Sequence, residues 1–271
     1  MTVEPRFFGG IDFSGAREPL SNLWTALGEG VGGRLRIVSL RPHAFRSDLA
    51  AYVAEGWRTS ATEDGNALWG ADFPFGLPLD VCGALGIKDS WDETLAWVAD
   101  RPPDEVKKAA GEAIRSARLA DAGALAPLDL RLYKQTVEGL RWLHELREDA
   151  AVAVYPQAPR GDADCLLIEV YPSATVRDLG LPRRRAPNRP GQLRARIAAF
   201  KPYLDFADPD VAAVAATLED AWDATIACLT AYLCRDDLAQ PQRLAPASLD
   251  RIAREGWIYR APAALEPPSA S

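Results

Sequence analysis

RFFGGIDFSGA, at positions 6–16, is the most informative stretch of this chain. Its first part is an apolar run typical of a buried strand, and Ser14, Gly15 and Ala16 end that strand just after Asp12. Two more strands are predicted close behind, at 22–27 and 34–40, joined by a glycine-rich turn. Three strands so closely spaced predict an antiparallel meander.

Further elements follow the meander in an order typical of an α/β domain. A helix is predicted first, then a nearly all-apolar strand of the kind that is buried on both faces, then a long helical stretch, two more strands and two more helices. The predicted ranges are 47–57, 66–72, 79–148, 150–155, 165–171, 192–204 and 211–234. This order fits a ribonuclease H-like mixed sheet flanked by helices, and it also fits other mixed α/β folds.

The predicted domain organisation is one domain over residues 1–261. It includes a helical insertion at about 79–148, after the fourth strand, because this helical stretch is longer than one crossover requires. The stretch 262–271 is rich in Ala, Pro and Ser, and we expect a disordered tail there.

Composition limits the classes of function. The net charge of −7 argues against a broad basic surface that coats nucleic acid, although it allows a local basic strip. No apolar run approaches the roughly 20 residues of a membrane span, and no secretory signal is visible, so we expect a cytoplasmic protein. The chain has two histidines and four cysteines without a CxxC pair, which disfavours zinc and a histidine base. Carboxylates are the better candidates for chemistry.

Two aspartates end apolar strands. Asp12 closes the first strand, and Asp72 closes the strand at 66–72 before a rigid turn with prolines at 74 and 78. A carboxylate at such a position is either a turn former or a member of a paired or metal-bound group. Since neighbouring strands lie roughly 4.8 Å apart, carboxylates at two adjacent strand ends can share one cation.

Three more acids are candidates. Glu169 lies inside the apolar run LLIEVYP at 166–172, where it either needs a buried partner or points to solvent from an edge strand. Asp220 and Asp223 are three residues apart on a predicted helix. Asp223 precedes a face of small residues suited to packing on a sheet, which favours it as the acid that points at the site, and Asp220 is the alternative.

Candidate substrate contacts are mostly basic. Lys134 and Arg131 flank the start of a predicted helix, and Arg183 and Arg184 belong to an arginine-rich stretch between 181 and 204. These side chains either contact phosphate or lie on solvated surfaces. Ser14 is a further candidate contact, but not a nucleophile, because no nearby histidine or lysine would activate it.

Four fragments together carry a family resemblance. They are GIDFSGA at 10–16, GADFPFGLP at 70–78, IEVYPSA at 168–174, and EDAWDA at 219–224 with EGWI at 255–258. In this order they resemble domain-of-unknown-function family 429, described as predicted ribonuclease H-like nucleases. The resemblance spans about residues 6–260.

The resemblance implies a ribonuclease H-like fold with an acidic metal site. Asp12 matches the first-strand aspartate of that superfamily, Asp72 and Glu169 match acids of later motifs, and Asp223 resembles the last-helix aspartate, with Asp220 as the competing assignment. The implied activity is phosphodiester hydrolysis with Mg²⁺ or Mn²⁺ held by Asp12, Asp72, Glu169 and Asp223. The expected partner is nucleic acid. The alternatives are a small-molecule phosphotransferase on the same fold and a non-catalytic binding domain.

Overall fold

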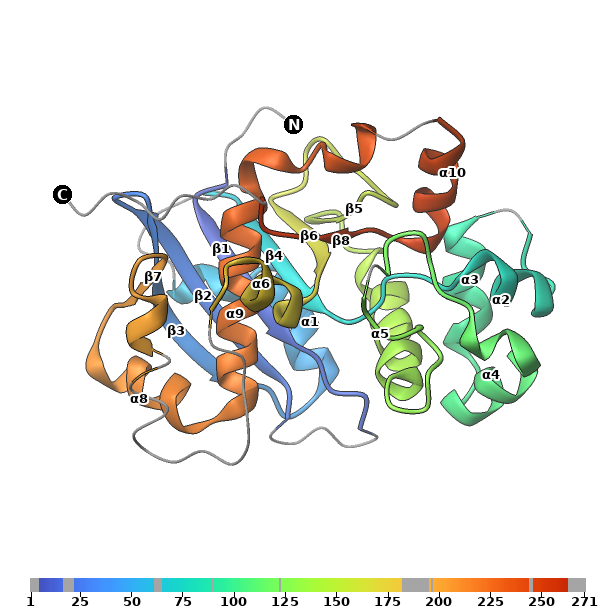
Figure 1. Ribbon diagram of the computed structural model, residues 1–271, viewed down its shortest axis with the longest axis horizontal. Helices are drawn as coiled ribbons and strands as arrows, with labels where there is room; N and C mark the ends of the chain where they lie inside the picture. Colours follow the sequence, from blue (N-terminus) through green and yellow to red (C-terminus); the bar gives the residue numbers. More distant parts are fainter. Residues whose placement is uncertain are drawn as a thin grey trace.

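In this computed structural model the described residues are 5–16, 22–60, 65–88, 90–121, 123–181, 195, 197–243 and 246–262. Within them, eight strands form one mixed sheet flanked by helices (Figure 1). The strands are β1 (Phe7–Asp12), β2 (Trp24–Val31), β3 (Arg34–Pro42), β4 (Ala67–Asp72), β5 (Val152–Tyr155), β6 (Cys165–Val170), β7 (Leu204–Phe206) and β8 (Ile258–Tyr259). The predicted α/β class with a mixed, helix-flanked sheet is confirmed.

The order of the strands brings three carboxyl ends together. Across the sheet the order is β5-β6-β4-β1-β2-β3-β7, and β8 pairs with β6. β1, β2 and β3 form the predicted antiparallel meander, whereas β4, β6 and β5 run parallel to β1. Parallel neighbours end at the same edge of a sheet, so the carboxyl ends of β1, β4 and β6 lie side by side, where ligand sites of α/β sheets are commonly built.

The hairpin between β2 and β3 is tighter than the predicted turn. β2 continues to Val31, and only Gly32 and Gly33 connect the strands, with φ of 58° and 78°. A two-residue hairpin with positive φ at both positions matches the right-handed twist of its strands, and glycine adopts such angles without strain. The preceding glycines of this stretch belong to the strand itself.

Two glycines allow close packing at the centre of the sheet. A Cβ at Gly10 would lie 2.0 Å from the carbonyl oxygen of Ala224 and 2.2 Å from the backbone nitrogen of Cys228, both in α9 (Glu219–Cys234). On the opposite face, a Cβ at Gly9 would lie 2.1 Å from the Trp69 ring. The absence of a side chain at Gly10 therefore lets α9 lie directly on the strand that carries Asp12.

A hydrophobic core lies on each face of the sheet. Phe7 and Ile11 of β1 pack with Trp57 and Trp142 on one face, and Phe8 packs with α9 on the other. The four cysteines are free and buried. The helices around the sheet include α1 (Arg46–Ala54), α6 (Pro172–Asp178), α8 (Pro209–Thr217) and α9, whereas α10 (Pro246–Glu255) contacts α2 (Leu79–Ala84) and α3 (Trp91–Ala99).

The predicted insertion at 79–148 contains four α-helices that stand beside the sheet (Figure 1). They are α2 (Leu79–Ala84), α3 (Trp91–Ala99), α4 (Pro103–Ala110) and α5 (Tyr133–Leu146). α5 packs against α3 and α4, and also contacts α1. The insertion therefore forms a wall next to the carboxyl ends of β1 and β4.

Two predictions about the later helices need correction. The helix predicted over 211–234 is two helices, because Leu218 is extended (φ −113°, ψ 124°) and separates α8 from α9. The helix predicted over 192–204 ends earlier, since Leu204 begins β7, which pairs with β3. Most of the preceding arginine-rich stretch, and the predicted tail beyond residue 262, lie outside the described residues.

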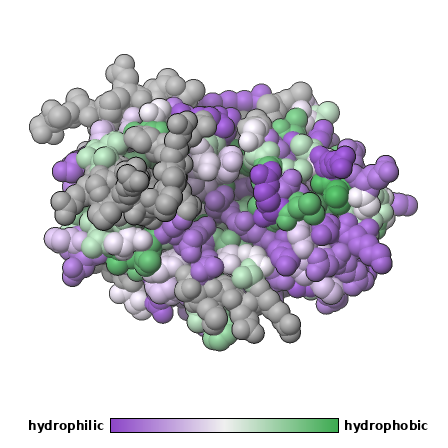
Figure 2. All heavy atoms as spheres, turned by 60° about the horizontal axis from the view of Figure 1, so that its bottom comes forward, coloured by the Kyte–Doolittle hydropathy of each residue, from purple (hydrophilic) through white to green (hydrophobic). Residues whose placement is uncertain are grey.

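Among the helices of the described ranges, none combines the length and the apolar character needed to cross a bilayer. Hydrophilic side chains cover much of the face shown in Figure 2, where the hydrophobic residues in view form separate patches. The described residues on this face are therefore mainly hydrophilic.

Candidate functional site

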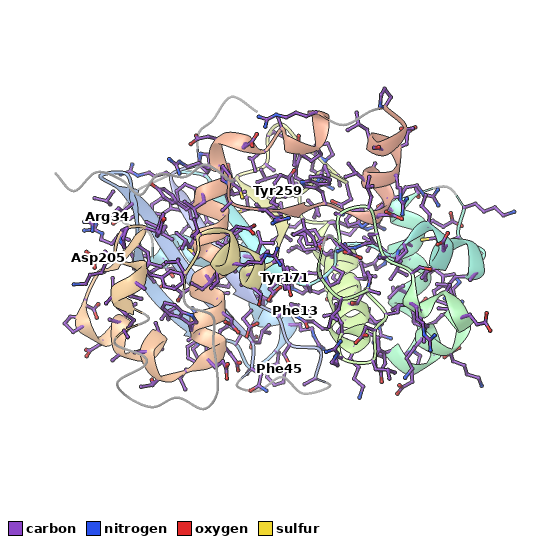
Figure 3. The ribbon with its side chains drawn as sticks, viewed as in Figure 1. Phe13, Arg34, Phe45, Tyr171, Asp205 and Tyr259 are labelled. Atoms are coloured by element: carbon purple, nitrogen blue, oxygen red, sulfur yellow. The ribbon has the colours of Figure 1, made fainter. Side chains whose placement is uncertain are left out.

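Asp12 and Asp72 meet at the carboxyl edge of the sheet. β1 ends at Asp12 and β4 ends at Asp72, and the two residues are direct partners in the parallel register. Both side chains are partly buried. Figure 3 marks this region through Phe13 and Tyr171, the residues that follow β1 and β6. The two carboxylates predicted from separate strand ends are therefore neighbours.

The electrostatic environment of this pair is negative. Burial raises the pKa of Asp12 well above its ordinary value, and Asp72, Asp223 and Asp220 raise it further. Burial likewise raises the pKa of Asp72, with added contributions from Asp223 and Glu169. Each carboxyl is therefore costly to ionise without a cation nearby.

The structure distinguishes the two candidate acids of α9. Asp223 raises the pKa of both Asp12 and Asp72, and Asp220 raises the pKa of Asp12. α9 lies against β1 and β4 through the glycine contact described above, which brings its first turns to the carboxyl edge. Asp223 is thus the α9 acid that lies close to both strand ends.

Glu169 lies beside this group but is held by an arginine. Its side chain is buried, at 2% exposure. Arg118 donates to both carboxylate oxygens, with Nη1 2.7 Å from Oε2, and the backbone N–H of Phe75 donates to Oε2 at 2.9 Å. Burial raises the pKa of Glu169, and Arg118 opposes this rise. Glu169 is an ion-pair partner here, so metal binding by it would require sharing with Arg118.

Arg118, which sequence reasoning missed, is the centre of a buried network. It also pairs with Asp121, through Nε to Oδ1 at 2.9 Å, and its Nη1 donates to the carbonyl of Glu255 at 3.0 Å. The Glu255 carboxylate accepts the N–H groups of Leu79 and Leu119, both at 2.8 Å. The network ties the helical insertion to β6 and α10. Its three segments, around Arg118, Glu169 and Glu255, are far apart in the chain.

The turn after β1 is fixed by α1 and α5. Arg46 donates from Nη2 to the carbonyls of Ser14 (3.1 Å) and Ala16 (2.6 Å). A Cβ at Gly15 would lie 2.3 Å from the backbone nitrogen of Gln135, so only glycine lets the turn approach α5. Gln135 also donates to the Asp72 carbonyl at 2.6 Å. Arg46 and Gln135 were not predicted, and together they hold both strand ends in place.

The predicted substrate contacts are only partly brought to this edge. Ser14 lies in the turn and accepts the N–H of Ala16 at 3.2 Å. The Lys134 ammonium lies 5.9 Å from the Tyr133 ring, and the exposed Arg131 pairs with Asp129 at 3.1 Å. Arg183 and Arg184 lie outside the described residues.

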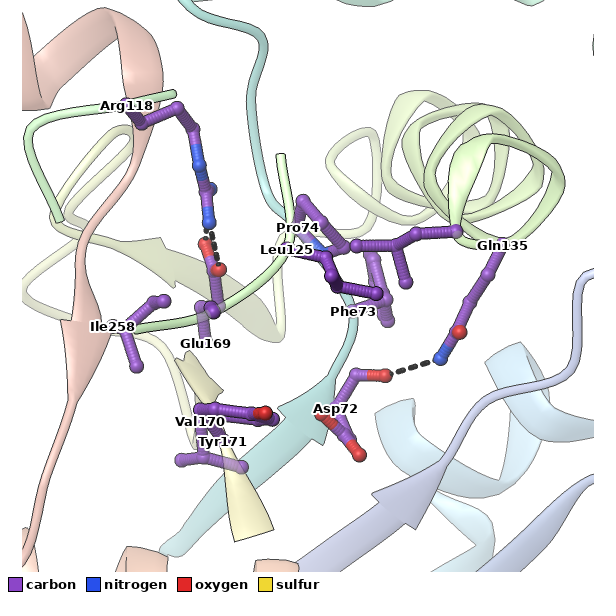
Figure 4. A pocket seen from close by; sticks show the side chains of 12 residues that line it. Asp72, Phe73, Pro74, Arg118, Leu125, Gln135, Glu169, Val170, Tyr171 and Ile258 are labelled. Atoms are coloured by element: carbon purple, nitrogen blue, oxygen red, sulfur yellow. Dashed lines mark hydrogen bonds and ion pairs between the residues drawn. The ribbon is translucent and has the colours of Figure 1, made fainter. Parts of the chain in front are cut away.

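A cavity of about 140 Å³ opens next to Asp72. Figure 4 shows Arg118 pointing at Glu169 on one side and Gln135 pointing at Asp72 on the other. The lining residues are Asp72, Phe73, Pro74, Arg118, Ala124, Leu125, Leu132, Gln135, Glu169, Val170, Tyr171 and Ile258. Residues of the insertion and of the sheet thus share one pocket.

In the described part of the chain, no three His, Cys, Asp or Glu side chains are arranged so that they could hold a metal by themselves. Asp12 and Asp72 still fit a hard cation, because they are paired oxygen donors and the neighbours that shift their pKa values are acids. Mg²⁺ in particular is often bound by one or two carboxylates, with waters and substrate phosphate completing its shell. No protein-family model, curated protein or solved structure matches this chain.

Proposed function

We propose that this chain is a divalent-metal-dependent nuclease with a ribonuclease H-like fold. The observed order supports the fold assignment: an antiparallel meander, then α1, then β4 parallel to β1. The sequence fragments that resemble domain-of-unknown-function family 429 imply the same fold. The cation in this proposal is Mg²⁺ or Mn²⁺.

One observation carries the proposal. Asp12 and Asp72 are register partners on adjacent parallel strands, and their shared environment makes both carboxyls hard to ionise. A purely structural position would favour a neutral or paired side chain, because unpaired like charges cost folding free energy. Binding of a cation requires carboxylates that lie close together and are held in place by rigid neighbouring residues.

Each residue has a role in this proposal. Asp12 and Asp72 would hold the cation, and Asp223 of α9 would contribute a third carboxylate through a bound water. Bound divalent ions supply an activated water and stabilise the departing oxygen. Arg46 and Gln135 keep the two strand ends in position. The basic residues Lys134, Arg131, Arg183 and Arg184 are proposed phosphate contacts, and Ser14 is a further proposed polar contact.

The test is cleavage of a nucleic-acid panel in Mn²⁺ and in Mg²⁺: single-stranded DNA and RNA, duplex DNA, an RNA–DNA hybrid and a four-way junction. Wild type should cleave at least one substrate. Asp12→Asn and Asp72→Asn should each lose about 100-fold or more, whereas Asp205→Asn should behave as wild type. Asp205 is a suitable matched control because it lies in β7, at the far edge of the sheet (Figure 3).

Two results would contradict the proposal: no cleavage of any substrate by wild type, or equal cleavage by wild type and Asp12→Asn. Titration calorimetry with Mn²⁺ on the same preparations then separates the alternatives. Metal binding with stabilisation by nucleotides would point to a small-molecule phosphotransferase, and no metal binding would point to a non-catalytic domain.

A further inference from the structure

The cavity beside Asp72 has room for more than solvent. One water needs roughly 10–15 Å³ of such space, and the cavity has about 140 Å³. Its volume is therefore roughly ten times that of a single-water site. This volume is comparable to that of the ring system of a nucleobase. It begins at the Asp72 strand end, so a group bound there would lie next to the proposed metal site.

The walls of this cavity are mainly apolar. Phe73 and Val170 contribute buried side chains, and Tyr171 adds a second aromatic ring. Leu125 lines the cavity from the insertion and is 36% exposed. Apolar and aromatic walls suit a flat ring, because bases gain binding free energy by stacking on such side chains.

The polar groups of the cavity select against anions. Asp72 and Glu169 line it, and the arginine of the lining, Arg118, is already paired with Glu169 and Asp121. A phosphate or carboxylate would therefore meet net negative charge. The cavity favours a neutral ligand, with hydrogen-bond donors directed at carboxylate oxygens.

Glu169 retains capacity to accept one such donor. An ionised carboxylate offers about four acceptor positions. Among the described residues, Arg118 and the Phe75 N–H donate to Oε2, and Arg118 alone donates to Oε1. Oε1 therefore has an acceptor position without a donor among these residues, and Glu169 lines the cavity. An exocyclic amino group of adenine, cytosine or guanine is such a donor. Uracil and thymine can donate only through N3–H, which lies between two carbonyl oxygens that a carboxylate repels.

We infer that this cavity is a binding subsite for one nucleobase that carries an amino group. The inference rests on the proposed nuclease function, since it assigns the cavity to a base of the substrate strand adjacent to the cleaved bond. It predicts that a substrate with adenine, cytosine or guanine at this position is bound in preference to one with uracil or thymine. It also gives Leu125 a role in substrate binding.

The test uses uncharged nucleosides in EDTA, so that neither metal nor phosphate contributes. Cytidine, adenosine and uridine are titrated into wild type and followed by saturation-transfer NMR. Leu125→Trp fills the cavity, and Leu130→Trp is the matched control, because Leu130 belongs to the same connection before α5, is 70% exposed and does not line the cavity. Thermal denaturation checks that both variants fold.

Cytidine and adenosine should bind about tenfold or more tightly than uridine. Leu125→Trp should weaken the binding of both by a similar factor, and Leu130→Trp should leave it unchanged. Equal binding of uridine, absence of binding by any nucleoside, or normal binding by Leu125→Trp would each overturn the inference. The nucleoside comparison in wild type holds even if a variant does not fold.

Different results would refute the base subsite and the nuclease activity. Cleavage that depends on metal and on Asp12, without nucleoside binding, would remove the subsite and leave the proposed function. Selective cytidine binding that is lost in Leu125→Trp, without any cleavage, would remove the proposed function and leave a nucleoside site.

Discussion

Replacing Asp72 by Asn should make the metal-free protein more stable at pH 8, although it removes a residue of the proposed site. Asp72 is a register partner of Asp12, and burial, Asp223 and Glu169 raise its pKa. Asn has nearly the same shape and carries no charge. The substitution therefore removes repulsion and desolvation while it keeps the packing.

The size of the effect follows from the strand spacing. Side chains of register partners on adjacent strands are about 5 Å apart, and two unit charges at that distance repel by about 3 kcal/mol at an effective dielectric constant of 20. Both carboxylates are partly exposed, so solvent screening lowers this value. We expect a gain of about 1–3 kcal/mol, which corresponds to a rise in Tm of roughly 2–10 °C.

The pH dependence of this gain has a definite sign. An aspartate in the unfolded chain titrates near pH 3.9, whereas the folded protein holds the Asp72 proton to higher pH. The folded wild type therefore loses stability as the pH rises from about 4 through the folded pKa of Asp72. The variant lacks this loss, so the gain should be absent near pH 4 and largest at pH 8.

The assay is urea denaturation in EDTA at several pH values between 4 and 8, with Asp205→Asn as the control. Adding Mn²⁺ should reverse the order, because the cation stabilises wild type through both carboxylates and the variant through one fewer. A variant less stable than wild type at pH 8 in EDTA, or a difference that does not change with pH, would refute the reasoning.

Three further predictions test the frame around the site. His43 is buried, and its burial, together with the nearby charge of Arg41, lowers its pKa to about 4. The free energy of unfolding of wild type should therefore fall by up to about 3 kcal/mol as the pH falls from 6.5 to 4. His43→Gln should remove that loss in urea denaturation, and an unchanged pH profile would contradict it. Arg118→Met leaves Glu169 buried without its ion pair and should cost about 3–5 kcal/mol; a loss below about 1 kcal/mol by the same assay would show that the network is dispensable. Gly10→Ala places a Cβ 2.0 Å from the backbone of α9 and should abolish soluble expression or lower Tm strongly. Gly83→Ala should be tolerated, because a Cβ at Gly83 would have no atom within 4 Å. Equal behaviour of the two variants would refute the close packing of β1 on α9.

Local patterns were sufficient to predict the strands that carry the site. β1 and β4 are apolar runs interrupted by an aspartate and a turn, and both were predicted within one residue of their observed ends. Such runs are recognisable because burial on both faces demands apolar residues throughout. The helix break at Leu218 escaped prediction, since apolar periodicity continues through it and only the backbone angles reveal it.

The sequence by itself determined the α/β class, the meander and the two aspartates at strand ends, because each depends on residues close together in the chain. Only the tertiary structure decided that Asp12 and Asp72 are register partners, that Asp223 lies close to both, and that Glu169 is paired with Arg118. The last pair is separated by 51 residues. Pairings of this kind depend on strand order and helix packing, which no local pattern of residues encodes.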